Sequence, residues 1–375
     1  MIDIKLWTIK LMKYLWYKNE NIIKIYCMSK FVYDIINKLH VDKTKYNSKM
    51  EYLKMKEYYN KINKNIIRNM LFYKNLSFNA TFSNINNNIF YSSSSSIINH
   101  PNDSDMYVIN TRVVNYYLDV MGKSNNNENC ITVNKISVLD NYFNEVKVKY
   151  LFPDKLSAKY VGIEDIRLFK FKNEIYFIGS LYNPKNNKVE IVSNKYILWE
   201  KYQPIIIKPS FKTDFNWEKN WVFFNNNDEI NIIYKWFPIY ICKIDYTSQQ
   251  LNLIKSIEKL PTIFNKFRGS TNGVHYDNKI WFVVHQQNAF INEIKSYVHN
   301  FVVFDKNMEL LGYSDEFKFE NKLVEFCVGM EITNKNNVVI TYSTLDSTSK
   351  LVVFSFDYVN SLITPTEKKN ETKSH

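Results

Sequence analysis

Glycine is unusually rare in this sequence. The chain has 7 glycines among 375 residues, roughly 2% where about 7% is usual. Because so little glycine is used, each one that remains is expected where the backbone needs a positive φ or a close approach to another segment. Four of them fall in short polar motifs along the chain: Gly162, Gly269, Gly273 and Gly329.

Arginine is also scarce. Only 4 of the 49 basic residues are arginine, which leaves 45 lysines, and the formal net charge is +12. Lysine, asparagine, isoleucine and tyrosine are favoured by an AT-rich genome, as in some viruses, so the positive charge is weak evidence for a nucleic-acid partner, and none is expected. Lysine does not replace arginine where a planar fork must grip a carboxylate or phosphate. The arginines Arg112, Arg167 and Arg268 therefore mark candidate site positions.

Several other features are missing. The four cysteines lie far apart without metal-type spacing, which predicts a reducing compartment and no metal site. No apolar run approaches the roughly 18 residues of a spanning helix. The N-terminus is broken by lysines and lacks a small-residue cleavage site, so a secretory signal is not expected. These features predict a cytoplasmic protein without a cofactor.

The first 78 residues are predicted to be helical. Apolar residues recur there at three- and four-residue spacing, and no proline or glycine precedes Pro101. This pattern is typical of amphipathic helices. We expect a helical extension over residues 1–78 that caps the main domain, with a peripheral membrane contact through residues 1–40 as the alternative.

From about residue 79 to residue 360 the sequence changes to short strand patterns. Five segments share one layout: a polar head, a short strand, an Asn- or Asp-containing turn and an aromatic–aliphatic strand. Repeats of this kind, with further strands between them and no long helices, predict an all-β fold, a five-bladed β-propeller. An irregular β-sandwich is the alternative, and residues 361–375 are expected to be a disordered tail. The five segments are residues 92–116, 162–182, 218–236, 267–286 and 324–343.

The polar heads should meet in space, because the innermost strands of a propeller converge on its central channel. Carboxylates beside several basic groups suit glycosidic-bond chemistry, which needs a proton donor and an anion or activated water. Converging cations also suit phosphate or another anion. The heads contribute Arg112, Asn115, Glu164, Asp165, Arg167, Lys219, Tyr234, Arg268, His285, His299 and Glu325.

The motifs resemble a known family. The stretch GIEDIRL, residues 162–168, is similar to the EDPR motif of the mannoside phosphorylases and hydrolases of glycoside hydrolase family 130, which are five-bladed propellers. KNW at 219–221, RGSTNG at 268–273, the strand ending at His285 with YVH at 297–299, and EFCVGM at 325–330 follow in the family's order. SIINHP and NTRVVNY, within residues 96–116, resemble its opening blade. The resemblance covers about residues 90–357.

The resemblance implies roles for individual residues. Asp165 matches the family's general acid, and Arg167, Lys219, Arg268 and His285 match phosphate-binding positions. Glu164 accompanies the acid, and Glu325 is the candidate for a water-activating base. One departure is visible, since Ile166 stands where the family has proline. Proline fixes φ and lacks an N–H donor, so the direction of the Asp165 side chain can differ from that in the family.

The sequence leaves structural alternatives open for most of these residues. Asp165 and Arg167 could form a structural ion pair, His285 could be a core histidine, and His299 could cap a strand. Trp217, Trp221 and Trp236 could form a sugar-stacking platform or pack between blades.

Two functions follow from this reading. The first is an enzyme that breaks or makes a β-mannoside-like bond by phosphorolysis or glycosyl transfer, with phosphate or a sugar nucleotide as co-substrate. The second is a non-catalytic propeller that binds a glycan or a protein. The sequence does not predict the sugar, the linkage or the oligomeric state.

Overall fold

The computed structural model describes residues 65–366, apart from residues 86–87, 120–123, 127–128, 155, 157, 214–216, 227 and 290–294. The chain divides into two units, residues 1–61 and 62–375, and all the described residues belong to the second. Most of the predicted helical extension, including residues 1–40, lies outside the described residues, as do residues 367–375 of the predicted tail.

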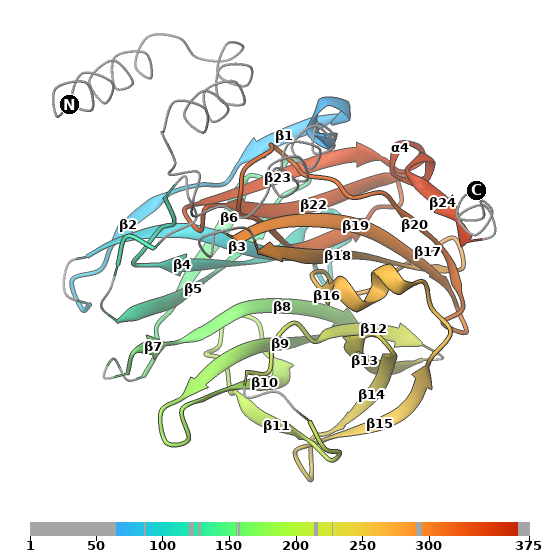
Figure 1. Ribbon diagram of the computed structural model, residues 1–375. Helices are drawn as coiled ribbons and strands as arrows, with labels where there is room; N and C mark the ends of the chain where they lie inside the picture. Colours follow the sequence, from blue (N-terminus) through green and yellow to red (C-terminus); the bar gives the residue numbers. More distant parts are fainter. Residues whose placement is uncertain are drawn as a thin grey trace, which may run out of the picture. The chain divides into compact units, whose positions relative to one another are not determined.

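The described residues are almost entirely β-structure, as predicted (Figure 1). Two 3-10 helices, η1 (Ile66–Asn69) and η2 (Thr262–Lys266), and one helix, α4 (Phe356–Ser361), accompany the strands. In this part of the chain no helix is long and apolar enough to cross a membrane.

Most strands join their neighbours in antiparallel meanders. The first contains β3 (Ile89–Asn99), β4 (Tyr107–Val114), β5 (Cys130–Leu139) and β6 (Glu145–Leu151), with β2 (Asn79–Thr81) beside β3 and β7 (Tyr160–Val161) beside β5. The second contains β8 (Ile163–Phe171), β9 (Glu174–Asn183), β10 (Lys188–Tyr196) and β11 (Ile205–Pro209). The third contains β12 (Val222–Asn226), β13 (Glu229–Trp236), β14 (Ile239–Asp245) and β15 (Gln250–Ile257), and β15 pairs in parallel with β11.

The remaining strands form two more sheets. The fourth contains β16 (Phe267–Gly269) and β17 (Val274–Tyr276), both paired with β18 (Lys279–Ala289), then β19 (Lys295–Asp305), β20 (Leu310–Ser314) and β24 (Ile363–Pro365). The fifth contains β21 (Glu325–Ile332), β22 (Asn337–Thr344), β23 (Thr348–Ser355) and β1 (Phe72–Asn75).

The predicted Asn and Asp turns have the backbone that such turns require. Asp277 and Asn278, between β17 and β18, have φ of 51° and 55°, and Asn336, between β21 and β22, has φ of 56°. Asn and Asp tolerate this left-handed region better than most residues. The chain can therefore make tight hairpins with very little glycine.

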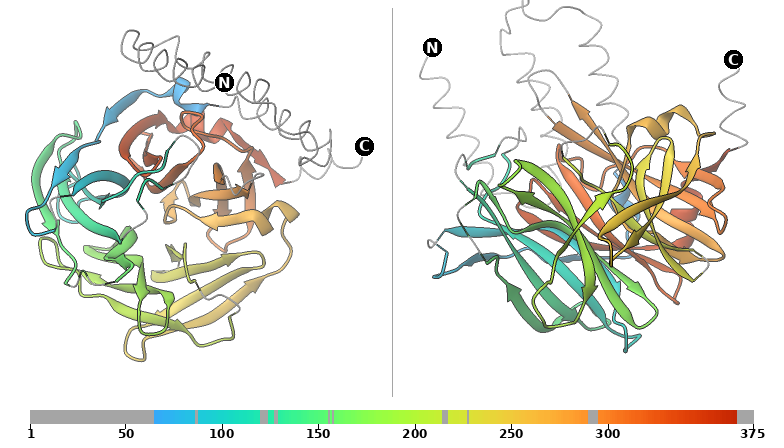
Figure 2. Two further views of the ribbon diagram at one scale, coloured as in Figure 1. Left: turned by 60° about the vertical axis from the view of Figure 1, so that its left-hand side comes forward. Right: turned by 90° about the horizontal axis from the view of Figure 1, so that it is seen from below.

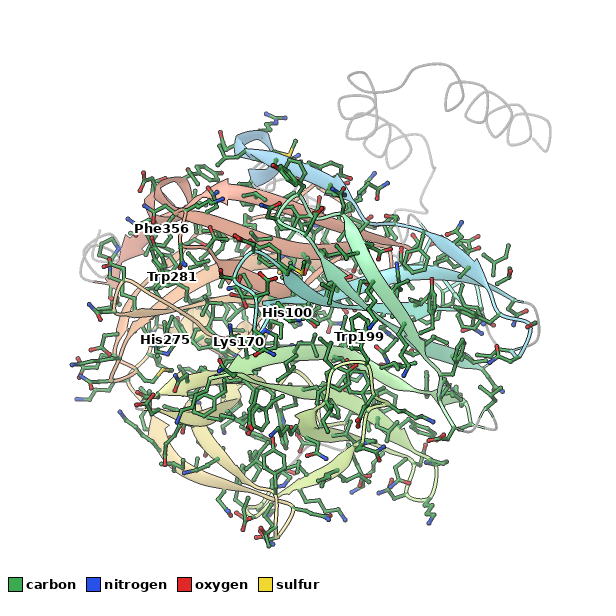
Figure 3. All side chains as sticks on the ribbon, turned by 180° about the vertical axis from the view of Figure 1, so that it is seen from behind. His100, Lys170, Trp199, His275, Trp281 and Phe356 are labelled. Carbon is green, nitrogen blue, oxygen red and sulfur yellow. The ribbon has the colours of Figure 1, made fainter. Side chains whose placement is uncertain are left out.

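Neighbouring sheets share hydrophobic cores because successive side chains of a strand point to opposite faces. On β12, Phe223 packs towards the second sheet and Phe224 towards the fourth. On β18, Phe282 packs towards the third sheet and Trp281 towards the fifth, where its ring lies 5.0 Å from that of Phe356 (Figure 3).

The hydrophobic cores between neighbouring sheets follow one another in a closed ring. Separate cores join the first sheet to the second, the second to the third, the third to the fourth and the fourth to the fifth, and another joins the fifth back to the first. In this last core, Val339 and Leu351 of the fifth sheet meet Ile97 and Ile109 of the first. The curved sheets stand around a common centre (Figure 2). This arrangement is consistent with the predicted propeller, whereas a sandwich would place one core between two layers.

Both predicted boundaries of the β-domain need correction. Residues 72–75, assigned to the helical extension, form β1 and pair with β23 at the other end of the described chain. Residues 363–365, assigned to the disordered tail, form β24 and pair with β20. Both segments are short and complete an existing sheet edge, so their own sequences carry little strand signal.

Candidate active site at the heads of the inner strands

Arg112 joins the first two sheets at the candidate site. It lies on β4, is 5% exposed, and reaches the head of β8. Its Nη2 lies 3.1 Å from Glu164 Oε1 and its Nη1 lies 3.2 Å from Asp165 Oδ1. The same guanidinium donates to Thr132 Oγ1 and to the Tyr116 hydroxyl. One arginine fork therefore holds two adjacent carboxylates, as its planar geometry allows.

A β-bulge explains how two neighbouring carboxylates reach the same arginine. In a regular strand Glu164 and Asp165 would point to opposite faces. The register of β8 against β9 shifts between Glu164 and Arg167, and Asp165 has φ of 51°. Such a bulge re-aims a side chain. Ile166, which stands where the resembled family has proline, is 1% exposed in the core between the first two sheets. The direction of the Asp165 side chain is thus set by the bulge and by the packing of Ile166, and not by a proline ring.

The charges around Asp165 determine its protonation. Burial alone would raise the pKa of Asp165, but the positive charges of Arg112, Arg167 and Lys219 and a hydrogen bond from Ser94 outweigh it. The pKa of Asp165 is therefore lower than usual, and the carboxylate is ionised at neutral pH in this ligand-free site. In this state it is a proton acceptor.

Asp346 is a third carboxylate at this site, and the sequence analysis missed it. It lies in the turn between β22 and β23, and the Ser93 hydroxyl donates to its Oδ1 over 3.3 Å. Burial raises the pKa of Asp346, and the nearby charges of Asp165 and Glu164 oppose the lowering effect of Arg112 and Ser93. Asp165 and Asp346 thus have pKa values shifted in opposite directions, the pattern that divides acid and base roles between two carboxyl groups.

The turn that carries Asp346 has unusual backbone geometry. Leu345 and Asp346 have φ of 53° and 49°, and positive φ is uncommon for a residue such as leucine. Backbone of this kind persists where surrounding contacts enforce it. Here the Leu345 N–H donates to Val324 O, and the Leu345 carbonyl accepts from the Leu118 N–H. The only sequence signal for Asp346 was an Asp in the polar hairpin that follows the fifth repeat.

The serine run of β3 supplies hydroxyl groups to both aspartates. Ser94 Oγ donates to Asp165 Oδ1 over 3.0 Å, and Ser93 Oγ donates to Asp346. The register of β3 against β4 shifts between Ser92 and Ser95, so consecutive serines can serve different carboxylates.

Lys219, predicted to bind an anion, lies beside the carboxylates. Its Nζ lies 3.5 Å from Glu164 Oε2, and its side chain is 35% exposed. It contributes to the low pKa of Asp165. This lysine is a partly solvated cation next to the carboxylates, suited to contact an incoming anion.

Arg167 is buried among backbone carbonyls. Its Nε donates to Ser270 O over 2.6 Å and its Nη2 to Gly269 O over 3.2 Å, while its Nη1 donates to the Asp165 carbonyl over 3.1 Å. Burial lowers the pKa of Arg167 to about 10. Among the described residues no carboxylate forms an ion pair with Arg167, and its hydrogen bonds connect the second sheet to the fourth.

Arg268 and His285 pair with each other in the register of β16 and β18. Arg268 is exposed and donates to Gln287 Oε1 over 3.2 Å, which leaves donors free for a ligand. His285 is 4% exposed, and its Nδ1 lies 2.9 Å from Ser270 Oγ. Burial lowers the pKa of His285 far below its usual value, so its imidazole is neutral.

Glu325 does not fit the predicted role of water-activating base. It is fully buried, and its carboxylate accepts backbone N–H groups of Phe319, Glu320 and Lys322 over 2.6 Å, 2.9 Å and 2.6 Å. Burial raises the pKa of Glu325. Its oxygens already organise the loop before β21, so it is a structural carboxylate.

Three further predicted site residues also have structural partners. His299 packs against the rings of Phe317 and Phe319, and burial lowers its pKa to about 3. The hydroxyl of Tyr234 donates to Glu218 Oε1, and Asn115 accepts from the Ile131 N–H while donating to Asn129 O. The Tyr234 and Asn115 side chains thus tie together local segments, and His299 packs among aromatic rings.

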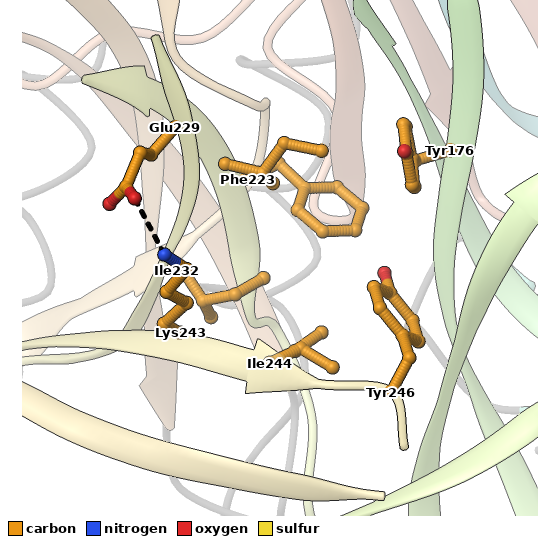
Figure 4. Close-up of a pocket in the computed structure, with 8 residues that line it drawn as sticks. Tyr176, Phe223, Glu229, Ile232, Lys243, Ile244 and Tyr246 are labelled. Atoms are coloured by element: carbon orange, nitrogen blue, oxygen red, sulfur yellow. Dashed lines mark hydrogen bonds and ion pairs between the residues drawn. The ribbon is translucent and has the colours of Figure 1, made fainter. Parts of the chain in front are cut away.

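Two features lie away from this site. A cavity of about 210 Å³ between the second and third sheets is lined by Tyr176, Phe223 and Tyr246, with an ion pair of 2.7 Å between Glu229 and Lys243 (Figure 4). The opposite end of β8 carries Lys170, whose Nζ donates to the His100 carbonyl over 3.2 Å.

Comparison with known proteins gives matches among solved structures only. No protein-family model and no curated protein matches this chain. A glycosyl hydrolase from Bacteroides ovatus is 13% identical over 71% of this chain and 84% of its own, with a TM-score of 0.49. A β-1,2-mannobiose phosphorylase from Listeria innocua is 12% identical over 73% and 93%, with a TM-score of 0.47. A mannose phosphorylase from Leishmania mexicana is 12% identical over 84% and 96%, with a TM-score of 0.46. The predicted resemblance to mannoside phosphorylases thus appears among solved structures, but similarity this distant assigns no activity.

Proposed function

We propose that this protein is a carbohydrate-active enzyme built on a five-bladed β-propeller. It breaks or makes a β-mannoside-like bond by phosphorolysis or glycosyl transfer. The observation that carries this proposal is the meeting of Glu164, Asp165 and Asp346 around Arg112, with Lys219 at the exposed side. Two aspartates whose pKa values are shifted in opposite directions, with a partly solvated cation nearby, suit glycosyl chemistry with an anionic partner.

Asp165 is the residue that moves the proton. In phosphorolysis a phosphate oxygen attacks the anomeric carbon, the bond from that carbon to the glycosidic oxygen breaks, and the leaving oxygen takes the proton of Asp165. The ligand-free carboxylate is ionised because Arg112, Arg167 and Lys219 surround it. A phosphate dianion beside Lys219 offsets this positive potential, so Asp165 gains a proton when the co-substrate binds.

Glycosyl transfer uses the same group in the other direction. The ionised Asp165 accepts the proton of an acceptor hydroxyl while that oxygen attacks the anomeric carbon, and phosphate or a nucleoside diphosphate leaves. The low pKa of the free carboxyl favours this direction when no phosphate is present. Asp346 carries a proton more readily than Asp165 and is suited to donate a hydrogen bond to a sugar oxygen.

The test is an assay for sugar 1-phosphate with manno-oligosaccharides and inorganic phosphate, run in both directions. The proposal predicts turnover by the natural chain and a turnover rate lower by about 100-fold or more in Asp165→Asn, the range for a proton-transfer group.

The second candidate is a non-catalytic propeller that binds a glycan or a protein, favoured by the fact that Arg112 already pairs with both carboxylates. Binding without turnover, unchanged by Asp165→Asn, would support that candidate.

A further inference from the structure

Three aromatic side chains gather outside the carboxylate cluster. We call Tyr160, Tyr182 and Trp217 the aromatic platform. The Tyr160 ring contacts the other two rings. Its centre lies 5.4 Å from that of Tyr182 and 6.1 Å from that of Trp217. Trp217 is 49% exposed, whereas Trp221 and Trp236, the other tryptophans considered for sugar stacking, are 1% and 2% exposed. Exposed aromatic clusters of this kind mark binding sites more often than isolated exposed residues do.

Hydrogen bonds anchor the segment that carries Trp217. The Trp217 backbone bridges to Val189, and the Glu218 N–H donates to the Val189 carbonyl over 3.0 Å. The Glu218 carboxylate then accepts from Trp221 Nε1 over 3.2 Å and from the Tyr234 hydroxyl over 3.1 Å. Tyr234, predicted as a substrate ligand, instead anchors the segment that presents Trp217. A preorganised aromatic surface binds with little loss of conformational entropy.

Lys219 connects the platform to the reacting groups. Its Nζ lies 5.5 Å from the Trp217 ring centre and 3.5 Å from Glu164 Oε2. Tyr160 is also close in sequence to Glu164, across Gly162, which has φ of 87°. A Cβ there would lie 2.1 Å from the Thr132 carbonyl oxygen. This tight approach requires glycine. Tyr160 of the platform and Glu164 of the carboxylate cluster therefore stand on either side of a close backbone contact.

The shape of the platform favours a sugar ring over a planar base. The Tyr160 ring meets Tyr182 at 70° and Trp217 at 80°, both edge-to-face. Tyr160 thus meets each neighbour at a corner, and neither ring lies parallel to the Tyr160 face as the second half of a stacking clamp would. A pyranose presents C–H groups to an aromatic face and hydroxyl groups at its edge, where Lys219 and Glu164 offer polar partners.

We propose that the aromatic platform binds a second sugar residue of the substrate, next to the one that reacts between Asp165 and Asp346. The inference rests on the proposed function, because it takes that cluster as the reacting site. The protein would then prefer oligosaccharides to free monosaccharides and sugar 1-phosphates. The specificity-determining residue is Trp217.

The test compares binding of β-linked manno-oligosaccharides of one to four residues to the full-length chain by calorimetry. The natural chain should bind the disaccharide and trisaccharide more tightly than mannose. Trp217→Ala should lose about tenfold in affinity for them, the range for one aromatic contact, and leave mannose unchanged. Trp217→Phe should restore part of the loss. Tyr142→Ala, at a tyrosine that is 72% exposed and outside the site, is the matched control and should change nothing.

The outcomes separate this inference from the proposed reaction. If Trp217→Ala binds every length as the natural chain does, or loses mannose equally, the platform is not a sugar subsite, whatever the turnover assay gives. If Trp217→Ala instead abolishes binding of a nucleoside diphosphate, the platform binds a nucleotide and the inference is overturned. Length-dependent binding that requires Trp217, without any sugar 1-phosphate, would uphold the platform and reject phosphorolysis.

Discussion

Arg112 and Asp165 come from different sheets and meet at 3.2 Å between Nη1 and Oδ1. They lie 53 residues apart in the sequence, and only the packing of the first sheet against the second brings them together. Because Arg112 also holds Glu164, this contact fixes the positions of both carboxylates and lowers the pKa of Asp165.

Arg112→Lys should destabilise the protein by about 1–3 kcal/mol, because a lysine cannot keep both carboxylates and leaves one of them underpaired. Chemical denaturation measures this change in the free energy of unfolding. Arg268→Lys is the matched control, since Arg268 is exposed and its side chain donates to Gln287 Oε1, and it should stay within about 0.5 kcal/mol. Equal effects of the two substitutions would contradict the assigned role of Arg112.

Phosphate should raise the pKa of Asp165. The low value in the free site comes from nearby cations, and a bound dianion offsets them. Carboxyl titration by NMR, with and without saturating phosphate, measures the shift. The pKa of Asp140 is also low, but mainly because of hydrogen bonds from Asn144 and Tyr142 within its own turn. Asp140 should not respond, and an unmoved Asp165 would place the phosphate elsewhere.

Glu325→Gln should lower stability by about 1–3 kcal/mol, because an amide nitrogen would face one or more of the three N–H groups that the carboxylate now accepts. Turnover per folded molecule should stay within about twofold. Glu174→Gln, at a surface ion pair with Lys195, is the control for stability. A large loss of turnover with unchanged stability would restore Glu325 as a catalytic base.

Glu331 should make the folded state less stable as pH rises. Burial raises its pKa to about 8, above the unfolded value of about 4.3. Between these values the folded state binds more protons than the unfolded state, so the free energy of unfolding falls with increasing pH. Glu331→Gln keeps an acceptor for Asn99 and should raise Tm at pH 8 by about 2 °C or more. No change at pH 8, or a larger gain at pH 5, would contradict this assignment.

The sequence was most informative where local chemistry decides structure. Alternating apolar residues and Asn or Asp turns predicted the strands, since both act over a few neighbouring residues. The scarcity of arginine and glycine pointed to Arg112 and Gly162, which are needed for a two-carboxylate grip and a tight backbone approach. These rare residues were informative because a lysine-rich, glycine-poor chain keeps them only where substitutes fail.

The sequence was least informative where a polar side chain bonds to distant backbone. Arg167 and Glu325 stand in motifs that suggest ligand binding, yet their partners are carbonyl and N–H groups that no side-chain pattern reveals. Asp346 was missed for the opposite reason. It lies in a hairpin that looks like an ordinary turn, and its position beside Asp165 depends on how the fifth sheet packs against the first.

The central claim is that Asp165 transfers a proton during phosphorolysis, and its most direct measurement is a ³¹P NMR time course of manno-oligosaccharides and inorganic phosphate with the full-length protein. The account predicts a growing sugar 1-phosphate signal with the natural chain and a signal at least 100-fold slower with Asp165→Asn, although that variant still binds the oligosaccharide. Equal rates for the two proteins, or binding of the sugar with no new phosphorus signal in either direction of the reaction, would contradict it.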